Sequence, residues 1–183
     1  MIQYPRNRLE QIVSAMVALK GTRTFLPSST NKKVQIWRFD RELLSGFVTP
    51  ITYLTSSGVE LLSLSGTAFI VPYAEIKRVH FVKDFAPSGK ALARNAFLTR
   101  PKLDGLWVRL LFKDGDSLEG VLSSNLLQLE PQGFTIVPPD YSYNNQRIFV
   151  PKCALVEMHV LGVAGSPLHR KKKVVKNQIE LFD

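Results

Sequence analysis

The sequence repeats itself once, and this repeat limits the possible folds more than any other feature. The segment VQIWRFDRELLSGFV at 34–48 aligns without a gap with VRLLFKDGDSLEGVL at 108–122. Two further pairs of segments align in the same way: 58–63 with 133–138, and 70–82 with 149–161. Because there are only two long copies, the pattern indicates duplication of a domain and not a solenoid.

Each copy has the pattern of short, bent antiparallel strands. Apolar residues alternate on both sides of an Asp-containing turn, and in the second copy this turn holds Asp114 and Gly115, a pair that tolerates positive φ. Gly46 and Gly120 lie at equivalent positions in the next strand, where a glycine indicates a bulge or a sharp bend. About five short strands fit into one copy, and bent strands in this number can close into a small barrel.

This arrangement resembles the Sm-like branch of the SH3-type barrels, whose first strand pair also carries an Asp-Gly turn followed by Leu-x-Gly. The resemblance and the repeat together predict a mainly β fold of two tandem five-stranded Sm-like barrels, barrel 1 over 32–83 and barrel 2 over 105–162. Residues 84–104 are predicted to link the barrels, with a short helical stretch at 90–97. Residues 163–183 are predicted to be a flexible basic tail.

Residues 1–31 are predicted to hold an amphipathic helix and a linker. Asn7 can serve as the N-cap of this helix and Gly21 as its stop. The apolar residues that recur at helical spacing are Leu9, Ile12, Val13, Met16 and Val17. We expect this apolar face to pack on a barrel; the alternative is a role in binding a membrane or a partner.

A longer run of segments resembles an uncharacterised family of bacterial domains. The run begins with HFVKDF at 80–85, continues through 108–122 and GFTIVPPD at 133–140, and ends with NNQRIFVPKCALVEM at 144–158. The resemblance covers about 68–161 and implies the same fold and a bacterial origin. Members often share a chain with regulatory modules such as PilZ or receiver domains, and the resemblance implies no activity and no catalytic residue.

The positive charge of the chain is concentrated at its two ends. The net charge is +9, of which residues 1–38 contribute +6, residues 39–164 contribute 0 and residues 165–183 contribute +3. A folded domain that reads nucleic acid usually carries a basic face of its own. Any contact with phosphates is therefore expected to come from the termini, and the alternative is a solubilising charge distribution without a partner.

Cysteine usage and hydropathy predict a cytoplasmic protein with no membrane partner. Cys153 is the only cysteine, so the chain can form neither an internal disulfide nor a Cys-based zinc cluster. No stretch reaches the roughly 18 to 20 apolar residues of a membrane span. The first residues also lack the apolar region of a signal peptide. Cys153 aligns with Ala74, which predicts a small buried site and an inert thiol.

No catalytic or cofactor motif occurs in the sequence. It has no G-x-x-x-x-G-K, G-x-G-x-x-G, H-E-x-x-H or C-x-x-C pattern, so we expect neither an enzyme nor a cofactor. Asp114, Asp116 and Glu119 could hold a cation, but an acidic hairpin tip is ordinarily solvated, so no metal site is predicted. His80 and His159 occupy equivalent repeat positions, which predicts a shared structural position on the polar face of a strand.

Two segments are candidates for contact with nucleic acid. The loop PPDYSYNNQR contains Tyr143, Asn145 and Arg147, and aromatic rings and amides on a loop can stack on bases and hydrogen-bond to them. Asn-Asn also favours ordinary turns, so a purely structural role is the alternative. The lysines and arginine of the tail can face phosphates, and these are Arg170, Lys171, Lys172, Lys173 and Lys176.

The C-terminal segment QIELF resembles the peptide with which bacterial replication and repair proteins dock on the DNA sliding clamp. The positions of this motif that carry Gln, an aliphatic residue, Leu and Phe are filled by Gln178, Ile179, Leu181 and Phe182. The few apolar anchors would give an affinity on the order of micromolar after the entropy of ordering is subtracted. The alternative is a terminal strand or helical turn that folds back on its own barrel.

These observations favour a non-enzymatic bacterial adaptor that docks on the sliding clamp through its C-terminal peptide, with weak contact between its lysines and nucleic acid. The alternative is an Sm-like RNA- or oligonucleotide-binding regulatory protein in which the peptide has no role. The sequence alone leaves both open.

Overall fold

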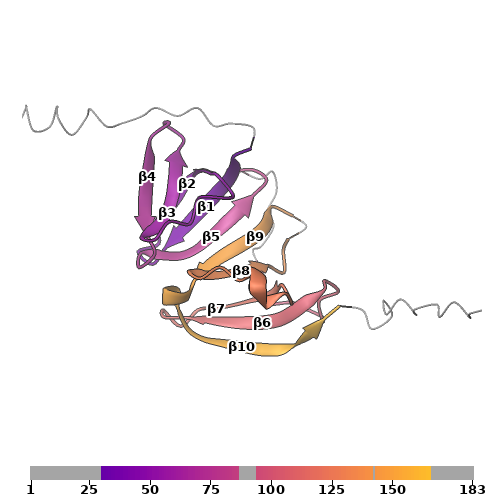
Figure 1. Ribbon diagram of the computed structural model, residues 1–183. Helices are drawn as coiled ribbons and strands as arrows, with labels where there is room; N and C mark the ends of the chain where they lie inside the picture. The colour runs from indigo at the N-terminus through magenta and orange to yellow at the C-terminus, as the bar shows by residue number, and fades with distance from the viewer. Residues whose placement is uncertain (1–29, 87–93, 142, 166–183) are drawn as a thin grey trace, which may run out of the picture.

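The computed structural model describes residues 30–86, 94–141 and 143–165, and these residues form a mainly β structure (Figure 1). The strands of the first half are β1 (Lys32–Arg38), β2 (Leu43–Val48), β3 (Gly58–Ser63), β4 (Ala68–Pro72) and β5 (Ile76–Val82). The strands of the second half are β6 (Gly105–Phe112), β7 (Ser117–Leu122), β8 (Gly133–Val137), β9 (Asn145–Pro151) and β10 (Leu155–Ala164). Short 3-10 helices, η2 (Leu126–Gln128) and η3 (Lys152–Ala154), precede β8 and β10.

Both halves have the same strand order. The first half runs β5-β1-β2-β3-β4 and the second runs β10-β6-β7-β8-β9, with antiparallel pairing throughout. Each strand of the first half coincides with the strand that the sequence repeat assigns to it in the second half. The equivalent turns also match, because the Arg38 N–H donates to the Glu42 carbonyl as the Phe112 N–H donates to the Asp116 carbonyl.

The structure does not confirm the two separate barrels that the sequence predicts. Strand β5 pairs with β9, so all ten strands lie in one continuous antiparallel sheet. The register sets Val79 opposite Phe149 and His80 opposite Ile148; we call this pairing the β5–β9 joint. A strand edge carries unpaired N–H and C=O groups, and the joint satisfies one such edge on each half with the other half.

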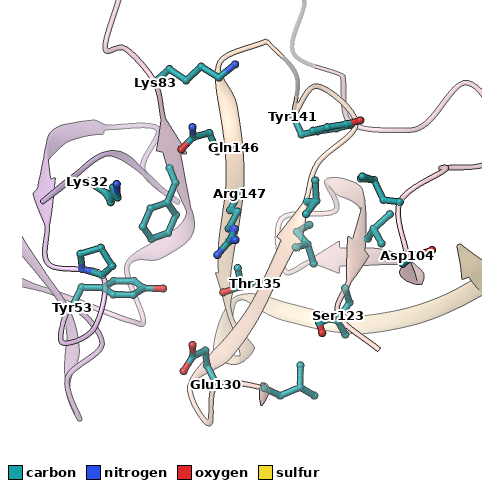
Figure 2. Close-up of a pocket in the computed structure, with 18 residues that line it drawn as sticks. Lys32, Tyr53, Lys83, Asp104, Ser123, Glu130, Thr135, Tyr141, Gln146 and Arg147 are labelled. Atoms are coloured by element: carbon teal, nitrogen blue, oxygen red, sulfur yellow. The ribbon is translucent and has the colours of Figure 1, made fainter. Parts of the chain in front are cut away.

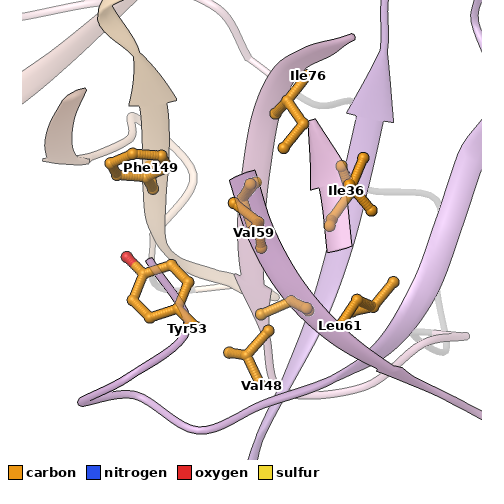
Figure 3. Close-up of a cluster of buried hydrophobic side chains, with 10 residues drawn as sticks. Ile36, Val48, Tyr53, Val59, Leu61, Ile76 and Phe149 are labelled. Atoms are coloured by element: carbon orange, nitrogen blue, oxygen red, sulfur yellow. The ribbon is translucent and has the colours of Figure 1, made fainter. Parts of the chain in front are cut away.

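The halves also share their hydrophobic cores. Phe149 of β9 is fully buried in the core of the first half, where its ring packs edge-on against Tyr53 with centroids 6.0 Å apart (Figure 3). In the opposite direction, Phe39 of the first half packs on the core of the second. Each core therefore contains a side chain that belongs to the other repeat.

An ion-pair cluster also ties the halves together. The Lys77 Nζ of β5 donates to Asp114 and Asp116, which flank the tip of the β6–β7 hairpin. Lys77 is largely buried, so two carboxylates and two charge-assisted hydrogen bonds compensate the loss of water around its ammonium group.

The two glycines that the sequence places inside strands are explained by close approach of neighbouring strands. A Cβ atom on Gly46 would lie 2.4 Å from the Leu62 carbonyl oxygen, and one on Gly120 would lie 2.5 Å from the Ile136 side chain. Both glycines are buried and sit opposite a valine of the preceding strand. Only a residue without a side chain lets these strands approach so closely.

Several predictions concern residues that the structure does not describe. The N-terminal helix, the tail residues 170–176 and the QIELF peptide all lie outside the described residues. Of the stretch 90–97, the described residues 94–97 form no helix. Strand β10 runs to Ala164, so the first residues assigned to the tail belong to the sheet. No helix within the described part of the chain is long and apolar enough to span a membrane.

Candidate functional site

A groove of about 960 Å³ lies between the two halves and is lined from both of them (Figure 2). Its first side is built by β1, the loop after β2 and β5, which carry Lys32, Tyr53 and Phe81. Its second side is built by β7, β8 and the segments beside them. Strand β9 crosses the groove and contributes Arg147, which Figure 2 shows between the two sides. We call this feature the interdomain groove.

Three basic residues of the groove come from three adjacent strands. Lys32 lies at the start of β1, Lys83 directly follows β5, and Arg147 lies on β9. Arg147 pairs in register with Phe81, which in turn pairs with Val34 of β1. The order β9-β5-β1 therefore brings together cations that are far apart in the sequence. All three are exposed, so they can meet a negatively charged ligand in solvent.

Aromatic side chains accompany these cations. Phe81 is half-buried and packs edge-on against Tyr53, with ring centroids 5.5 Å apart. Burial raises the pKa of Tyr53, and its protonated phenol can act as a hydrogen-bond donor on the first side of the groove. Tyr141 is exposed at the edge of the groove and offers a ring face to solvent.

A second cleft of about 390 Å³ is formed by the segment between the halves. Tyr141 and Leu103 line both spaces. The described residues that line the second cleft include Arg94, Arg100 and Lys102, and no acidic residue is among them. The acidic residues of the first groove are Asp104 and Glu130, so six cations and two carboxylates from the described part of the chain line the two spaces together.

The predicted residues of the 138–147 loop have different roles in the structure. Arg147 lines the interdomain groove. Tyr143 is exposed and lines neither cleft, and its N–H donates to the Asp140 carbonyl over 3.0 Å. Asn145 has a structural role, because its Nδ2 donates to Asp140 Oδ2 over 2.7 Å and its Oδ1 lies 3.0 Å from His80 Nδ1. This side chain is therefore not presented to a base.

The side chains of His80 and Asn145 form a hydrogen bond across the β5–β9 joint. Asn145 Nδ2 is committed to Asp140, so its Oδ1 is the acceptor and His80 Nδ1–H the donor of the bond between them. His80 Nε2 is buried and has no hydrogen-bond partner in the described part of the chain. Burial, and then the charge of Arg78, lowers the pKa of His80 to about 4. A neutral imidazole with an unprotonated Nε2 fits this site.

The three acidic residues considered for a cation are separated by the fold. Asp114 and Asp116 accept from Lys77, whereas Glu119 is buried on β7 and faces elsewhere. Glu119 Oε2 accepts from the Trp107 indole and from the Phe97 backbone N–H, each over 3.1 Å, and its Oε1 accepts from Arg109 over 2.8 Å. Burial opposes ionisation, but these bonds outweigh it and lower the pKa of Glu119.

Glu119 thus attaches the segment between the halves to the second half. Its backbone N–H also donates to the Asn95 carbonyl over 2.7 Å, so both the backbone and the side chain of Glu119 bind the segment 95–97. Among the described residues, no group of three or more His, Cys, Asp or Glu side chains could hold a metal ion.

Two expectations about repeat-equivalent residues are wrong. Cys153 is exposed and not buried, and its thiol donates to the Tyr73 carbonyl over 3.3 Å. Its equivalent Ala74 is exposed as well, so alignment with a small residue did not indicate burial. His80 and His159 do share a register position, but His80 is buried in the joint and His159 is exposed beside Glu157 on the outermost strand.

Sequence reasoning missed most of the basic groove. Lys32, Lys83 and the cations of the segment between the halves lie far apart in sequence, within stretches whose net charge cancels or was assigned to a terminus. Only the pairing of β9 with β5 and β1 brings Lys32, Lys83 and Arg147 into one groove. Arg147 in the NNQRIF segment was the one groove cation that the sequence identified as a candidate for contact with nucleic acid.

Comparisons with known proteins give one match. A family model described as "Family of unknown function (DUF6982)" matches residues 30–162, which span both halves of the sheet. No curated protein and no solved structure gives a significant match.

Proposed function

The chain belongs to this family of unknown function, DUF6982, and we propose that it is a non-enzymatic, cytoplasmic, Sm-like protein that binds single-stranded nucleic acid in the interdomain groove. Equal strand order in the two halves supports the Sm-like assignment of each half. The observation that carries the proposal is the set of six cations that line the two clefts among the described residues, together with exposed Tyr141, which lines both clefts.

The chemistry of the groove suits a flexible, charged strand better than a small molecule. Cations from β1, β5 and β9 can neutralise successive phosphates, while Tyr141 and the half-buried Phe81 offer rings on which bases can stack. Arg100 and Lys102 extend the same positive character beyond Tyr141. Such contacts read the backbone and the ring faces, so binding is expected to tolerate many sequences.

Fluorescence anisotropy with labelled single-stranded RNA and DNA tests this proposal. We expect Lys32→Ala and Arg147→Ala each to weaken binding and to reduce the slope of log K against log salt by about 0.7, the value for one lost phosphate contact on a single strand. Tyr141→Ala should weaken binding by about 1 to 3 kcal/mol without changing that slope, because stacking releases no counterions.

Lys113→Ala is the matched control, because Lys113 is exposed at the β6–β7 turn and lines neither cleft. Its removal should leave affinity and salt dependence unchanged. Full binding by the Lys32→Ala, Arg147→Ala double variant would contradict the groove as the site, and binding that is instead lost with residues 170–176 would move the contact to the tail.

A second candidate function rests on the QIELF peptide. In this role the protein is an adaptor that docks on the bacterial DNA sliding clamp through Gln178, Ile179, Leu181 and Phe182. Nucleic-acid contact through the groove would then hold the complex on its substrate, and tethering would strengthen a peptide affinity of the order of micromolar.

Replacing both Leu181 and Phe182 by Ala tests the adaptor role. Clamp binding measured by surface plasmon resonance should be lost, while the melting temperature and the affinity for oligonucleotides stay unchanged. A fold-back role for the peptide predicts the opposite, a loss of roughly 2 to 5 kcal/mol in the free energy of unfolding. Absence of clamp binding by the wild-type chain would end the adaptor proposal and leave the groove proposal standing.

A further inference from the structure

Strand β10 ends the sheet and exposes apolar side chains on the face that borders a core. Its outer edge pairs with no strand of the described residues (Figure 1). Met158 and Val160 pair with Leu110 and Val108 of β6, which are fully buried in the core of the second half. Directly paired residues point to the same face of a sheet. Met158 and Val160 are nevertheless 38% and 58% exposed, so the core side of β10 is uncovered.

The equivalent strand of the first half has no such uncovered edge. Strand β5 aligns with β10 in the repeat, and Val79 aligns with Met158. Val79 is fully buried, because β9 pairs with β5 in the β5–β9 joint and sets Phe149 opposite it. Strand β10 therefore lacks the neighbour that β9 provides for β5.

A segment near the C-terminus resembles the part of β9 that pairs with β5. Strand β9 contains NQRIF at 145–149, and the C-terminal segment reads NQIELF at 177–182. Both begin with Asn-Gln and end with an aliphatic residue followed by Phe, and the second is longer by one residue. The register of the joint already skips Gln146, so a residue can be left out of the pairing at this point.

We propose that residues 177–182 pair antiparallel with the free edge of β10 and so repeat the β5–β9 joint at the end of the sheet. When Phe182 takes the place of Phe149, the register of the joint sets it opposite Met158. The same register sets Leu181 opposite His159 and Glu180 opposite Val160. Phe182 then covers the core side of β10 as Phe149 covers that of β5.

The connection between β10 and this segment is long enough for the chain to reverse. Strand β10 ends at Ala164, and Gly165 follows with φ of 113°, a conformation that suits a turn out of a strand. Residues 165–176 remain for the reversal, whereas antiparallel neighbours can be joined by a loop of only about two residues. The basic residues 170–173 fall within this connection, so their charges stay outside the new strand pair.

The proposed pairing is weaker than the internal joint. Val156 stands in the place of Lys77, so the ion-pair cluster that Lys77 makes with the β6–β7 hairpin has no counterpart on β10. Residues 177–182 therefore leave β10 more easily than β9 leaves β5. Docking on a sliding clamp needs the same side chains, so the two contacts exclude each other. The inference does not rest on the groove, because Met158 and Val160 line neither cleft.

Hydrogen–deuterium exchange of the full chain tests the pairing. A paired edge protects backbone N–H groups of β10, so deletion of residues 177–183 should raise the exchange rates across 156–163 by about tenfold or more. Phe182→Lys should have the same effect, because it buries a charge at the edge of the core. A chain with Lys171→Ser, Lys172→Ser and Lys173→Ser is the matched control and should exchange like the wild type.

The outcomes of this experiment separate the possible occupants of the edge. Unchanged exchange after the deletion would overturn the proposal. Protection of β10 that persists in the deleted chain and rises with protein concentration would assign the edge to a second copy, and protection that persists at every concentration would assign it to another segment of the same chain. Either result would also overturn the proposal.

Cysteine cross-linking tests the register. In a Cys153→Ser background, Met158→Cys with Phe182→Cys should form a disulfide within one chain on mild oxidation, because opposed residues of an antiparallel pair bring their Cβ atoms within reach. Val163→Cys with Phe182→Cys is the control, since Val163 is exposed on the same strand and nearer to the start of the tail. A freely moving segment would reach Val163 at least as often. Equal cross-linking of both pairs, or disulfides between chains, would overturn the proposal.

Discussion

His80 and His159 occupy the same position of the two repeats, and their environments differ because only one of them lies in the joint. His80 donates to Asn145, and its buried Nε2 has no partner among the residues that the structure describes, whereas His159 lies exposed beside Glu157. Protonating His80 would place a buried N–H without an acceptor next to Arg78, which is why its pKa falls to about 4. At the scale of a residue, the joint therefore depends on a neutral histidine.

We predict that acid weakens the fold through His80. In the unfolded chain this imidazole has a pKa of 6.5, so between pH 6.5 and about 4 the unfolded state binds the proton first and the free energy of unfolding falls as the pH falls. The total loss is about 3 kcal/mol, at about 1.4 kcal/mol for each unit of pKa difference. Urea titrations at several pH values measure it.

The variant His80→Gln should flatten this pH dependence, because a glutamine can donate to Asn145 without titrating. Glu119 has a lowered pKa and also loses stability in acid, so the comparison between variants isolates the histidine. His159→Gln is the control and should follow the wild type. Parallel pH profiles for all three proteins would contradict the role assigned to His80.

At the scale of the element, the β1–β2 and β6–β7 hairpins show how one turn is made by two different sequences. Gly115 has φ of 84° in the second hairpin, and Arg41 has φ of 69° at the equivalent position of the first. In both turns the residue with positive φ donates its N–H to the carbonyl three residues earlier. Only the second turn has glycine at this position, the residue that a positive φ favours.

We therefore expect Arg41→Gly to raise the free energy of unfolding by about 0.5 to 1 kcal/mol, because it removes the strain of a side chain at positive φ. Gly115→Ala should lower it by about 1 kcal/mol for the same reason. Gly162→Ala is the control for glycine replacement, because nothing lies within 4 Å of its added Cβ and its φ is not in the positive region. Denaturant titration of the three variants measures these differences, and a destabilised Arg41→Gly would contradict the argument.

In the whole molecule, the two halves form one packed unit, because each half contributes side chains that pack into or bind the other half. Phe149 completes the core of the first half, Phe39 covers the core of the second, and Lys77 is neutralised by the hairpin of the other repeat. Neither half keeps its core intact without the other. Cooperative unfolding of both halves follows from this exchange.

The chain offers a probe for each half, since Trp37 and Trp107 are its two tryptophans. In single-tryptophan variants of the otherwise wild-type chain, we predict that both probes report the same denaturation midpoint. Phe149→Ala should cost about 3 to 5 kcal/mol and separate the two midpoints, because it removes the shared part of the core. Phe47→Ala is the control, since Phe47 packs on Phe85 within the first half and should lower stability without separating the probes.

Patterns within short stretches of the sequence were enough to predict the strands and turns of this protein. The alternation of apolar residues around 34–48 and 108–122, the turn at Gly115 and the strand glycines at 46 and 120 placed strands where the structure has them. These signals are local, because the conformation of a turn and the inward face of a strand depend on neighbouring residues. The repeat also predicted that both halves contain equivalent strands.

How the strands of the two halves are joined depends on contacts between residues that are distant in the sequence. Expecting two separate barrels, we did not foresee that β5 pairs with β9, because edge pairing depends on which backbone groups remain unpaired after each half has folded. The same pairing brings Arg147 beside Lys83 and Lys32, buries His80 and leaves His159 exposed. Residues with equal positions in the two repeats thus acquire different chemistry, since burial and charge depend on neighbours that are distant in the sequence.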